Sequence, residues 1–418
     1  MDKFIIKGGR KLDGTVEIST AKNSVLPIIS ACILNGKKNI IHKTPMLEDV
    51  FVITKVLEGL NAKINIDEKT SDLIIDTSEL NPIDALDGLV RKMRASFLLM
   101  GPMLARFGQF KIMLPGGCNI GTRPIDLHLK GLAALGAEIN IGHGYVEAKA
   151  KKLKGNNIYL DFPSVGATEN IMMCSVLAEG ETILGNCAEE PEIVDLANFL
   201  NKMGACVEGA GTDTIKITGV KELNTVEYTP IYDRIEAGTF MIAAAITKSK
   251  FKIKGAHEEH IKPVMAKLIE MGVKIDINED EMIIDGGETL KSVDIKTMPY
   301  PGFPTDMQSQ IMALLSVVTG TSVITENIFE NRFMHVPELN RMGANIKIDG
   351  WSAIIQGVER LTGAEVKATD LRAGATMILA GLAAEGTTII SDIYHIDRGY
   401  THIEEKLRKL GADIIREK

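Results

Sequence analysis

The sequence predicts an α/β protein of two domains, in which one αβ unit of about 70 residues is repeated six times. Three observations support this prediction: two short markers recur with a common period, and each repeat holds a segment that is apolar on nearly every face. The first marker is a Leu-Gly-Ala or Met-Gly-Ala triplet, with small variations, before alternating apolar residues. It begins at Leu60, Leu135, Met203, Met271, Met342 and Leu410, in steps of 75, 68, 68, 71 and 68 residues.

The second marker is a glycine or small polar turn that leads into a short strand. It lies at Gly36, Gly108, Gly180, Ser249, Gly320 and Gly386, in step with the first marker. Two independent markers with one period indicate repeats. Because a period of about 70 residues is too long for a solenoid, we expect compact units grouped by three.

A predicted helix precedes each of these turns, and it is apolar nearly all round, which is typical of a helix inside a protein. These helices are expected at 20–34, 91–105, 166–178, 235–246, 304–318 and 368–383. Each repeat continues with a strand, a polar loop, an amphipathic helix such as 191–203, and a strand after the first marker. The apolar helices are therefore expected at the centre of each domain, with the sheets outside.

The domain boundary is expected near residue 230, since a chain of 418 residues exceeds the usual size of a single core. The segment 6–23 aligns without a gap to 355–372, so the first strand repeats a segment of the second half. We therefore expect residues 22–230 in the first domain, and residues 1–21 with 231–418 in the second. Residues 217–219 lead in the same way to Arg234, so Asn23, Arg234 and Arg372 take equivalent positions near the amino end of an apolar helix.

Composition excludes several classes of protein. The net charge of -8 argues against a general nucleic-acid binder. The five cysteines lack CxxC spacing, which argues against a disulfide framework or a zinc site. The amino terminus has no signal-peptide core and no apolar run is long enough to span a bilayer, so we expect a cytoplasmic protein without a membrane partner.

One cysteine stands in a glycine-rich segment, Pro115-Gly116-Gly117-Cys118, five residues before Arg123. Glycines let a backbone approach a ligand closely, and a guanidinium favours the reactive thiolate. This context is compatible with a reactive thiol. A turn with an incidental cysteine is the alternative, because most cysteines are small buried hydrophobic residues.

Arginine is placed selectively. Arg91, Arg94, Arg234 and Arg372 open predicted apolar helices, whereas Arg123, Arg332 and Arg398 lie in polar loops. Helix amino ends carry free N–H groups, and arginine adds bidentate geometry, so together they favour a phosphate or carboxylate pocket. Pairing with a nearby acid, such as Glu190, Asp370 or Asp397, is the alternative for each arginine. Asp306 opens another apolar helix, as a candidate general base or as a plain helix cap.

Taken together, the motifs resemble those of the UDP-N-acetylglucosamine 1-carboxyvinyltransferase family. The resemblance runs the full length and rests on Lys22-Asn23, Arg94, the Cys118 loop with Arg123, Pro304-Thr305-Asp306, Phe329-Glu330-Asn331-Arg332-Phe333, Asp370-Leu371-Arg372 and Asp397-Arg398-Gly399-Tyr400. It implies an inside-out α/β barrel of two domains with three repeats each. It also implies enolpyruvyl transfer from phosphoenolpyruvate to the 3'-hydroxyl of UDP-N-acetylglucosamine, which commits this sugar to peptidoglycan synthesis.

The resemblance implies a role for each matching residue. Phosphoenolpyruvate would contact Lys22, Arg123 and Arg398, and Cys118 would be proton donor, covalent adduct site and target of the epoxide antibiotic fosfomycin. The implied nucleotide-sugar positions are Asn23, Arg94, Arg123, Pro124, Ile125, Asp126, Leu127, Ser164, Val165, Asp306 and Ile328. Arg332 and Arg372 would shape the site and pair with its acids. Phe162 stands where some members carry lysine, so a charged contact there is not expected.

The chemistry fits these residue types, because enolpyruvyl transfer needs an acid near C3, cations around the phosphate and a base near the sugar hydroxyl. Cys118 would be the acid and Asp306 the base, with no metal or organic cofactor. Since Lys22, Cys118, Asp306 and Arg398 come from both halves, we expect a pocket shared by the domains, a mobile Cys118 loop and a monomer. The rivals are the shikimate-pathway enolpyruvyl transferase and a non-catalytic binder of nucleotide sugars.

Overall fold

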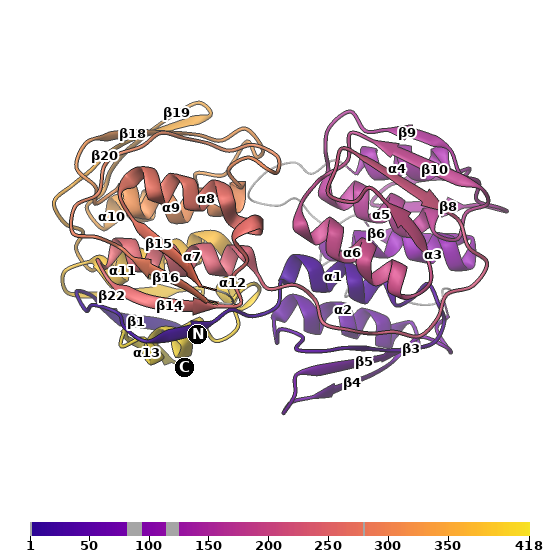
Figure 1. Ribbon diagram of the computed structural model, residues 1–418, viewed down its shortest axis with the longest axis horizontal. Helices are drawn as coiled ribbons and strands as arrows, with labels where there is room; N and C mark the ends of the chain where they lie inside the picture. Colours follow the sequence, from indigo (N-terminus) through magenta and orange to yellow (C-terminus); the bar gives the residue numbers. More distant parts are fainter. Residues whose placement is uncertain (1, 82–93, 114–124, 279–280) are drawn as a thin grey trace. The chain divides into compact units, whose positions relative to one another are not determined.

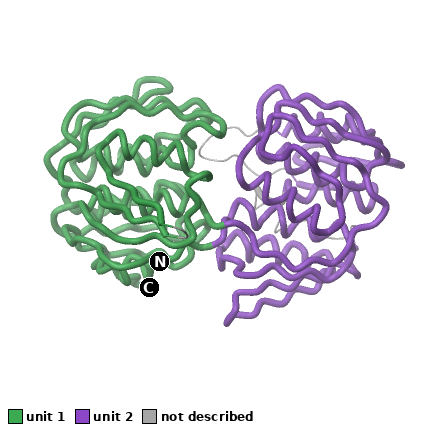
Figure 2. The backbone as a smooth tube through the Cα atoms, viewed as in Figure 1, with its two compact units in different colours: residues 1–19, 118–122, 232–418 green, residues 20–117, 123–231 purple. Residues whose placement is uncertain are grey.

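The computed structural model describes residues 2–81, 94–113, 125–278 and 281–418, with the side chains of residues 94–96 left out (Figure 1). The chain forms two compact units (Figure 2). Unit 1 contains residues 2–19 and 232–418, and unit 2 contains the described residues of 20–231. We propose that these units are the two domains expected from the repeats, with the predicted bounds of 22–230, and 1–21 with 231–418.

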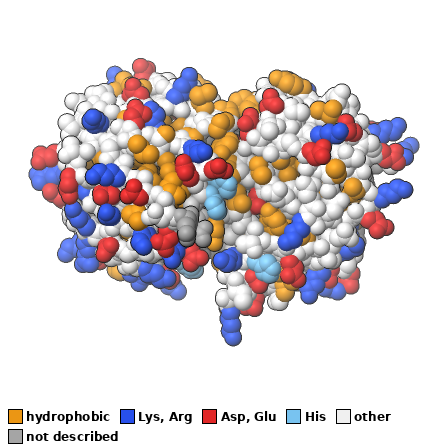
Figure 3. All heavy atoms as spheres, viewed as in Figure 1, with side chains coloured by type: hydrophobic (Ala, Val, Ile, Leu, Met, Phe, Trp, Pro, Cys, Tyr) orange, Lys and Arg blue, Asp and Glu red, His pale blue; other side chains and the backbone are white. Residues whose placement is uncertain are grey.

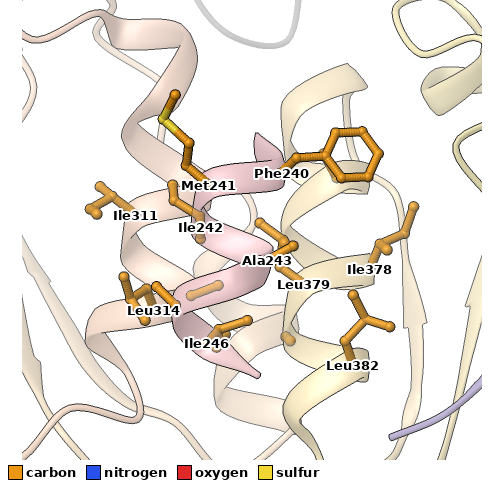
Figure 4. Packing of buried hydrophobic residues seen from close by; sticks show 14 of the residues in the cluster. Phe240, Met241, Ile242, Ala243, Ile246, Ile311, Leu314, Ile378, Leu379 and Leu382 are labelled. Atoms are coloured by element: carbon orange, nitrogen blue, oxygen red, sulfur yellow. The ribbon is translucent and has the colours of Figure 1, made fainter. Parts of the chain in front are cut away.

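Three buried helices form the core of unit 1: α7 (Arg234–Ile246), α9 (Gln308–Leu315) and α11 (Leu371–Ala383). Every residue of α7 after Arg234 is buried, as expected of a helix that is apolar all round. The three helices pack against one another, and Figure 4 shows Ile242 of α7 toward Ile311 of α9 and Ala243 toward Leu379 of α11.

Three four-stranded sheets accompany these helices in unit 1, and each strand order is given by its hydrogen bonds. The first sheet runs β15 (Lys274–Asn278), β16 (Glu281–Asp285), β14 (Lys250–Lys254), β2 (Thr15–Glu17); the second runs β17 (Ile295–Lys296), β18 (Thr321–Thr325), β20 (Ser352–Gln356), β19 (Asn345–Asp349); the third runs β21 (Glu365–Lys367), β22 (Thr387–Ser391), β1 (Lys3–Lys7), β23 (Asp413–Glu417). In β14, Phe251 and Ile253 are buried while the three lysines that alternate with them are exposed, so one face of the strand meets the core.

The remaining helices of unit 1 are α8 (Glu258–Met271), α10 (Val336–Arg341), α12 (Tyr394–Asp397) and α13 (Ile403–Lys409). In α8, the buried residues Ile261, Val264, Met265 and Leu268 recur at helical spacing. This pattern confirms the amphipathic helix expected after the strand in that repeat.

Unit 2 repeats the same plan. Its core helices are α1 (Lys22–Ala31), α3 (Met100–Phe107), which follows the 3-10 helix η2 (Arg94–Leu99), and α5 (Val165–Ser175); its amphipathic helices are α2 (Glu48–Gly59), α4 (Asp126–Ala134) and α6 (Pro191–Lys202). The sheets run β13 (Glu227–Tyr228), β3 (Lys38–Ile41), β5 (Asp72–Asp76), β4 (Lys63–Asp67); β11 (Cys206–Glu208), β12 (Thr214–Thr218), β10 (Glu181–Gly185), β9 (Asn157–Tyr159); and β6 (Gln109–Met113), β8 (Tyr145–Lys149), β7 (Glu138–Gly142). The sixfold repeat is therefore confirmed.

Short parallel strands connect neighbouring repeats. In unit 1, β17 leaves one repeat and pairs with β18 of the next, and β21 pairs with β22 in the same way. The amino-terminal segment completes two sheets of unit 1, because β1 lies between β22 and β23 while β2 pairs with β14. Both chain termini accordingly lie in this unit (Figure 1). The prediction that residues before 21 pack with the carboxy-terminal repeats is confirmed for β1 and β2.

Both sequence markers lie where the backbone adopts the left-handed conformation, with positive φ. The first is a residue with positive φ after each amphipathic helix, at Asn61 (69°), Gly136 (102°), Gly204 (100°), Gly272 (109°), Gly343 (93°) and Gly411 (98°). Glycine adopts this conformation without strain and asparagine tolerates it, which explains why only asparagine replaces glycine here. The second marker has positive φ at its five glycines, and in the fourth repeat the neighbouring Lys248 takes this conformation at 50°.

Except for α7, the core helices are shorter than their apolar patterns. The helix expected at 20–34 ends at Ala31, because Ile33 and Leu34 form a turn whose N–H groups donate to carbonyls three residues back. These turn residues stay buried, so they are apolar although they are not helical. Among the described residues, no helix has the length and apolar character needed to cross a bilayer. Lys and Arg are interspersed with Asp and Glu on the visible surface of both units (Figure 3).

Candidate active site

Asp306 lies between two buried arginine side chains in unit 1. Arg332 Nη2 donates to one carboxylate oxygen at 2.8 Å, and Arg372 Nη2 donates to the other at 2.9 Å. The arginine side chains are 4% and 5% exposed, whereas the aspartate side chain is 27% exposed. Buried cations need such a partner, because losing it would leave uncompensated charge in a medium of low dielectric constant. Both arginines therefore pair with Asp306, and the place of all three in the active site stays a prediction.

Asp306 stands in a 3-10 helix, η3 (Thr305–Met307), which leads into α9. It is not the capping residue: Pro304 occupies that place, and η3 has no side-chain cap hydrogen bond. Asp233 and Asp370 are the caps, since their carboxylates accept backbone N–H groups at the starts of α7 and α11. The alternative that Asp306 is a plain helix cap is therefore wrong, and Asp370 is not the partner of the Arg372 guanidinium.

Arg372 keeps donors for a further partner. Its Nε and Nη1 atoms are buried and have no hydrogen-bond partner among the residues that the structure describes. Burial opposes the charge, but Asp306, Tyr400 and Asp233 outweigh it, and the pKa of Arg372 lies above its ordinary value. A permanent cation with unused donors in the first turn of a buried helix is suited to an anionic ligand.

Tyr400 connects the starts of the three core helices of unit 1. Its hydroxyl lies 2.9 Å from Thr239 Oγ1 of α7 and accepts a 3.4 Å hydrogen bond from Gln310 Nε2 of α9. Its ring centroid lies 5.7 Å from the guanidinium carbon of Arg372 on α11. Gln310 Nε2 also donates to the backbone oxygen of Asp306 at 2.8 Å. Tyr400 therefore contacts Arg372 directly and is connected to Asp306 through Gln310.

Arg398 follows α12 as its carboxy-terminal cap and is half-buried. Its neighbour Asp397 forms a close ion pair with Arg416. Burial and the positive charge of Arg398 lower the pKa of His395. Arg398 thus adds a third cation to the predicted site residues of unit 1, besides Arg332 and Arg372, in the chain segment that carries Tyr400.

Glu326 is a buried carboxylate that the sequence analysis missed. It is 1% exposed and accepts hydrogen bonds from two threonine hydroxyls and two backbone N–H groups. One hydroxyl belongs to Thr305, which precedes Asp306, and one N–H belongs to Ile328, a predicted nucleotide-sugar position. In the sequence, Glu326 is one acid among several after a strand, and no spacing distinguishes it.

Lys22 and Asn23 open α1 in unit 2, as predicted. Lys22 Nζ lies 2.9 Å from an oxygen of Asp49, and the two side chains are only 12% and 8% exposed. Ser24 follows, and its hydroxyl donates to the buried carboxylate of Asp195 in a close hydrogen bond. Asp195 also accepts from the Tyr228 hydroxyl at 2.5 Å and from Ile231 N at 3.1 Å. The start of α1 is therefore tied to the last residues of unit 2.

The predicted nucleotide-sugar positions after residue 124 lie at the starts of two helices. Ile125 precedes α4, where Asp126 is exposed and Leu127 half-buried, and Ser164 caps α5 with its hydroxyl before Val165. His128 and Asn170 connect these helices through a 2.9 Å contact from Nδ1 to Nδ2. Phe162, before α5, is 44% exposed.

Several predicted side chains lie outside the part of the chain that the structure describes. Cys118, Arg123 and Pro124 lie outside the described residues, and only the backbone of Arg94 is described, at the start of η2. Within the described ranges, no group of three or more His, Cys, Asp or Glu could hold a metal ion. Unit 1 thus brings together Asp306, Arg332 and Arg372, with Ile328 connected through Glu326, and unit 2 brings together the starts of α4 and α5.

Comparisons with known proteins show the family of this chain. The family profile described as EPSP synthase (3-phosphoshikimate 1-carboxyvinyltransferase) matches residues 6–407. Proteins named UDP-N-acetylglucosamine 1-carboxyvinyltransferase from Clostridium tetani and Clostridium acetobutylicum are each 67% identical over 416 residues and are covered completely, as is this chain.

Solved structures show the same fold. The enolpyruvyl transferase NikO from Streptomyces tendae superposes with a TM-score of 0.90 at 26% identity, covering 99% of this chain and 98% of that one. An EPSP synthase from Acinetobacter baumannii gives a TM-score of 0.76 at 19% identity over the full length of both chains, which speaks for the fold alone. The protein is an enolpyruvyl transferase by fold and by descent, and it belongs to the UDP-N-acetylglucosamine 1-carboxyvinyltransferase family.

Proposed function

We propose that this protein transfers the enolpyruvyl group of phosphoenolpyruvate to the 3'-hydroxyl of UDP-N-acetylglucosamine and releases phosphate. This reaction is the first committed step of peptidoglycan synthesis. The observation that carries the proposal is the 67% identity, over the full length, to proteins named for this reaction. The buried Asp306–Arg332–Arg372 cluster supports it, because it combines a carboxylate with cations.

The proposed reaction is an addition followed by an elimination. The sugar 3'-oxygen forms a bond to C2 of phosphoenolpyruvate while C3 gains a proton, which gives a tetrahedral ketal. The C2–O bond to phosphate then breaks and C3 loses a proton, which restores the double bond. The site must therefore supply an acid near C3, a base near the 3'-hydroxyl and cations for the phosphate and carboxylate.

In unit 1, we assign the base to Asp306 and phosphate contacts to Arg398. Both carboxylate oxygens of Asp306 already accept from arginine, so the acceptor hydroxyl must replace or share one of these contacts. The unused Nε and Nη1 of Arg372 would take up the charge of the anionic substrate. Arg332 would keep the carboxylate oriented, and Ile328 would contact the nucleotide sugar.

In unit 2, we assign phosphoenolpyruvate contact to Lys22 and nucleotide-sugar contact to Asn23. The nucleotide-sugar positions Ile125, Asp126, Leu127, Ser164 and Val165 are supported by their place at two helix starts, where N–H groups are available. Cys118 as proton donor and adduct site, and Arg94, Arg123 and Pro124 as binding residues, rest on the family resemblance. We further propose that the enzyme acts as a monomer in the cytoplasm, without a cofactor.

Phosphate release from phosphoenolpyruvate tests the proposal, with UDP-N-acetylglucosamine and shikimate 3-phosphate as alternative acceptors. We expect release with the nucleotide sugar and none above background with the shikimate. Release with shikimate 3-phosphate alone would overturn the assignment in favour of a shikimate-pathway enolpyruvyl transferase. Light scattering on the purified enzyme measures its mass in solution and tests whether it is a monomer.

The role of Cys118 is tested by Cys118→Ser, with the exposed Cys206→Ser as the matched control. We expect Cys118→Ser to lower kcat at least 100-fold while UDP-N-acetylglucosamine binding is kept, because a hydroxyl is a much weaker acid than a thiol. Fosfomycin should label the wild type and Cys206→Ser, but not Cys118→Ser. Unchanged kinetics in Cys118→Ser would remove this residue from the mechanism.

A further inference from the structure

Glu326 is a buried acid satisfied by neutral donors. It directly follows β18 and is 1% exposed. Thr297 Oγ1 donates at 2.9 Å, Thr305 Oγ1 lies 3.0 Å from both carboxylate oxygens, and the backbone N–H groups of Ile328 and Phe329 donate at 2.9 and 3.2 Å. Burying a carboxylate is costly unless it is hydrogen-bonded, so all these donors must be in place together.

These donors come from two segments that carry proposed site residues. Thr305 is the residue before Asp306, in the 3-10 helix that begins α9. Ile328 and Phe329 belong to the loop that continues to Arg332, whose guanidinium pairs with Asp306. Asn327 strengthens the connection, because its side chain donates to Thr297 O at 2.9 Å. Glu326 thus fixes the backbone on both sides of the Asp306–Arg332 pair.

The direction of these hydrogen bonds limits what the loop can offer a ligand. The N–H groups of Ile328 and Phe329 both point at Glu326. The nucleotide sugar can therefore meet only the carbonyl oxygens and side chains of these two residues. A loop held in this way keeps its acceptors in one place before the substrate binds, which lowers the cost of binding.

We propose that Glu326 is a positioning residue that sets the place of Asp306 through Thr305 and the place of the nucleotide-sugar loop through Ile328. This inference rests on the proposed function of Asp306 and Ile328. Glu326 itself touches no substrate. Because small displacements of a reacting group cost much of the rate, loss of Glu326 should act mainly on kcat and on the KM for the nucleotide sugar.

The test uses substitutions that change hydrogen bonding while keeping shape. Glu326→Gln places an NH2 group among donors, and Thr305→Val removes the hydroxyl that Glu326 accepts from. Thr305→Ser keeps this hydroxyl and is the matched control, and Glu365→Gln, an exposed acid on β21, controls for charge. The double variant Glu326→Gln/Thr305→Val measures the coupling between the two residues.

We expect Glu326→Gln and Thr305→Val to lower kcat about 10- to 100-fold and to raise the KM for UDP-N-acetylglucosamine, with the KM for phosphoenolpyruvate unchanged. Thr305→Ser and Glu365→Gln should stay within about twofold of the wild type, and the double variant should lose far less than the product of the single losses. Equal loss of kcat in Thr305→Ser, or multiplicative losses in the double variant, would overturn the proposal. A fall in active fraction with both KM values unchanged would show a merely structural role and would also overturn it.

Hydrogen exchange gives a second reading that does not depend on turnover. The amides of Ile328 and Phe329 should exchange at least tenfold faster in Glu326→Gln than in the wild type or Glu365→Gln. If the wild type turns over neither acceptor, the proposed function fails, and the exchange result alone then decides the role of Glu326. If the wild type is active and neither kinetics nor exchange changes in Glu326→Gln, the inference fails while the function stands.

Discussion

At the scale of single residues, one carboxylate compensates two buried guanidinium groups. Asp306→Asn keeps the shape of this side chain but removes the charge between Arg332 and Arg372. We expect kcat to fall at least 100-fold, because the proposed base is lost. We also expect the free energy of unfolding to fall by about 3 kcal/mol, because two buried cations lose their partner.

Steady-state kinetics and urea unfolding measure the two effects separately. Asp276→Asn, an exposed acid on β15, is the control and should change neither. If Asp306→Asn keeps full activity with reduced stability, Asp306 is a structural counter-ion and not the base.

The residue types of this cluster could be predicted from the sequence, but the pairings could not. Arg372 could be singled out because it opens a predicted helix, and Arg332 because it lies in a polar loop. Their common partner is 26 and 66 residues away in the chain, whereas Asp370 lies two residues from Arg372 and turned out to be a helix cap. Glu326 was missed because hydrogen bonds to neutral donors from distant segments leave no pattern in one sequence.

At the scale of elements, the recurring Gly-Ala marker is a backbone requirement. Gly343 has φ 93°, and a Cβ added there would meet Thr362 at an ordinary 3.8 Å. Gly343→Ala should therefore lower the free energy of unfolding by about 1–2 kcal/mol through backbone strain alone. Gly59→Ala, at the end of α2 with open space around the new methyl, should instead raise it by about 0.5–1 kcal/mol. Equal effects in urea unfolding would contradict this explanation of the marker.

The burial of one histidine, His128 of α4, gives unit 2 a pH dependence. Burial lowers the pKa of His128 to about 4, from an ordinary value of 6.5. Between these values the unfolded chain binds the proton and the folded protein does not, so stability falls as the pH falls from 6.5 to 4. His335, also buried with a pKa of about 4, adds to this loss in unit 1.

His128→Gln removes one of these two titrations. Relative to its own stability at pH 7, we expect the variant to lose up to about 3 kcal/mol less than the wild type at pH 4. Thermal unfolding across this range checks the difference in slope, which a constant packing defect does not change. If the curves of stability against pH are parallel for the variant and the wild type, His128 takes up its proton in the folded protein over the same pH range as in the unfolded chain.

At the scale of the whole molecule, most of the fold could be predicted because it is repeated. A pattern that is ambiguous in a single repeat becomes clear when six repeats share it. The likeness of residues 6–23 to residues 355–372 also indicated that the amino-terminal segment belongs with the carboxy-terminal repeats, and β1 does pair with β22 and β23. The parallel strands that connect the repeats could not be predicted. Strands such as β17 and β13 are only two residues long, and pairing with another repeat is what defines them.

The central claim is that the protein breaks the C–O bond of phosphoenolpyruvate, and the fate of the bridging oxygen tests it most directly. With phosphoenolpyruvate carrying 18O in the bridge between C2 and phosphorus, and with UDP-N-acetylglucosamine as acceptor, addition and elimination leave the label in the released phosphate. Mass spectrometry should find 18O in the phosphate and unlabelled ether oxygen in the enolpyruvyl product. Label left on the three-carbon fragment would show attack at phosphorus and would contradict the account.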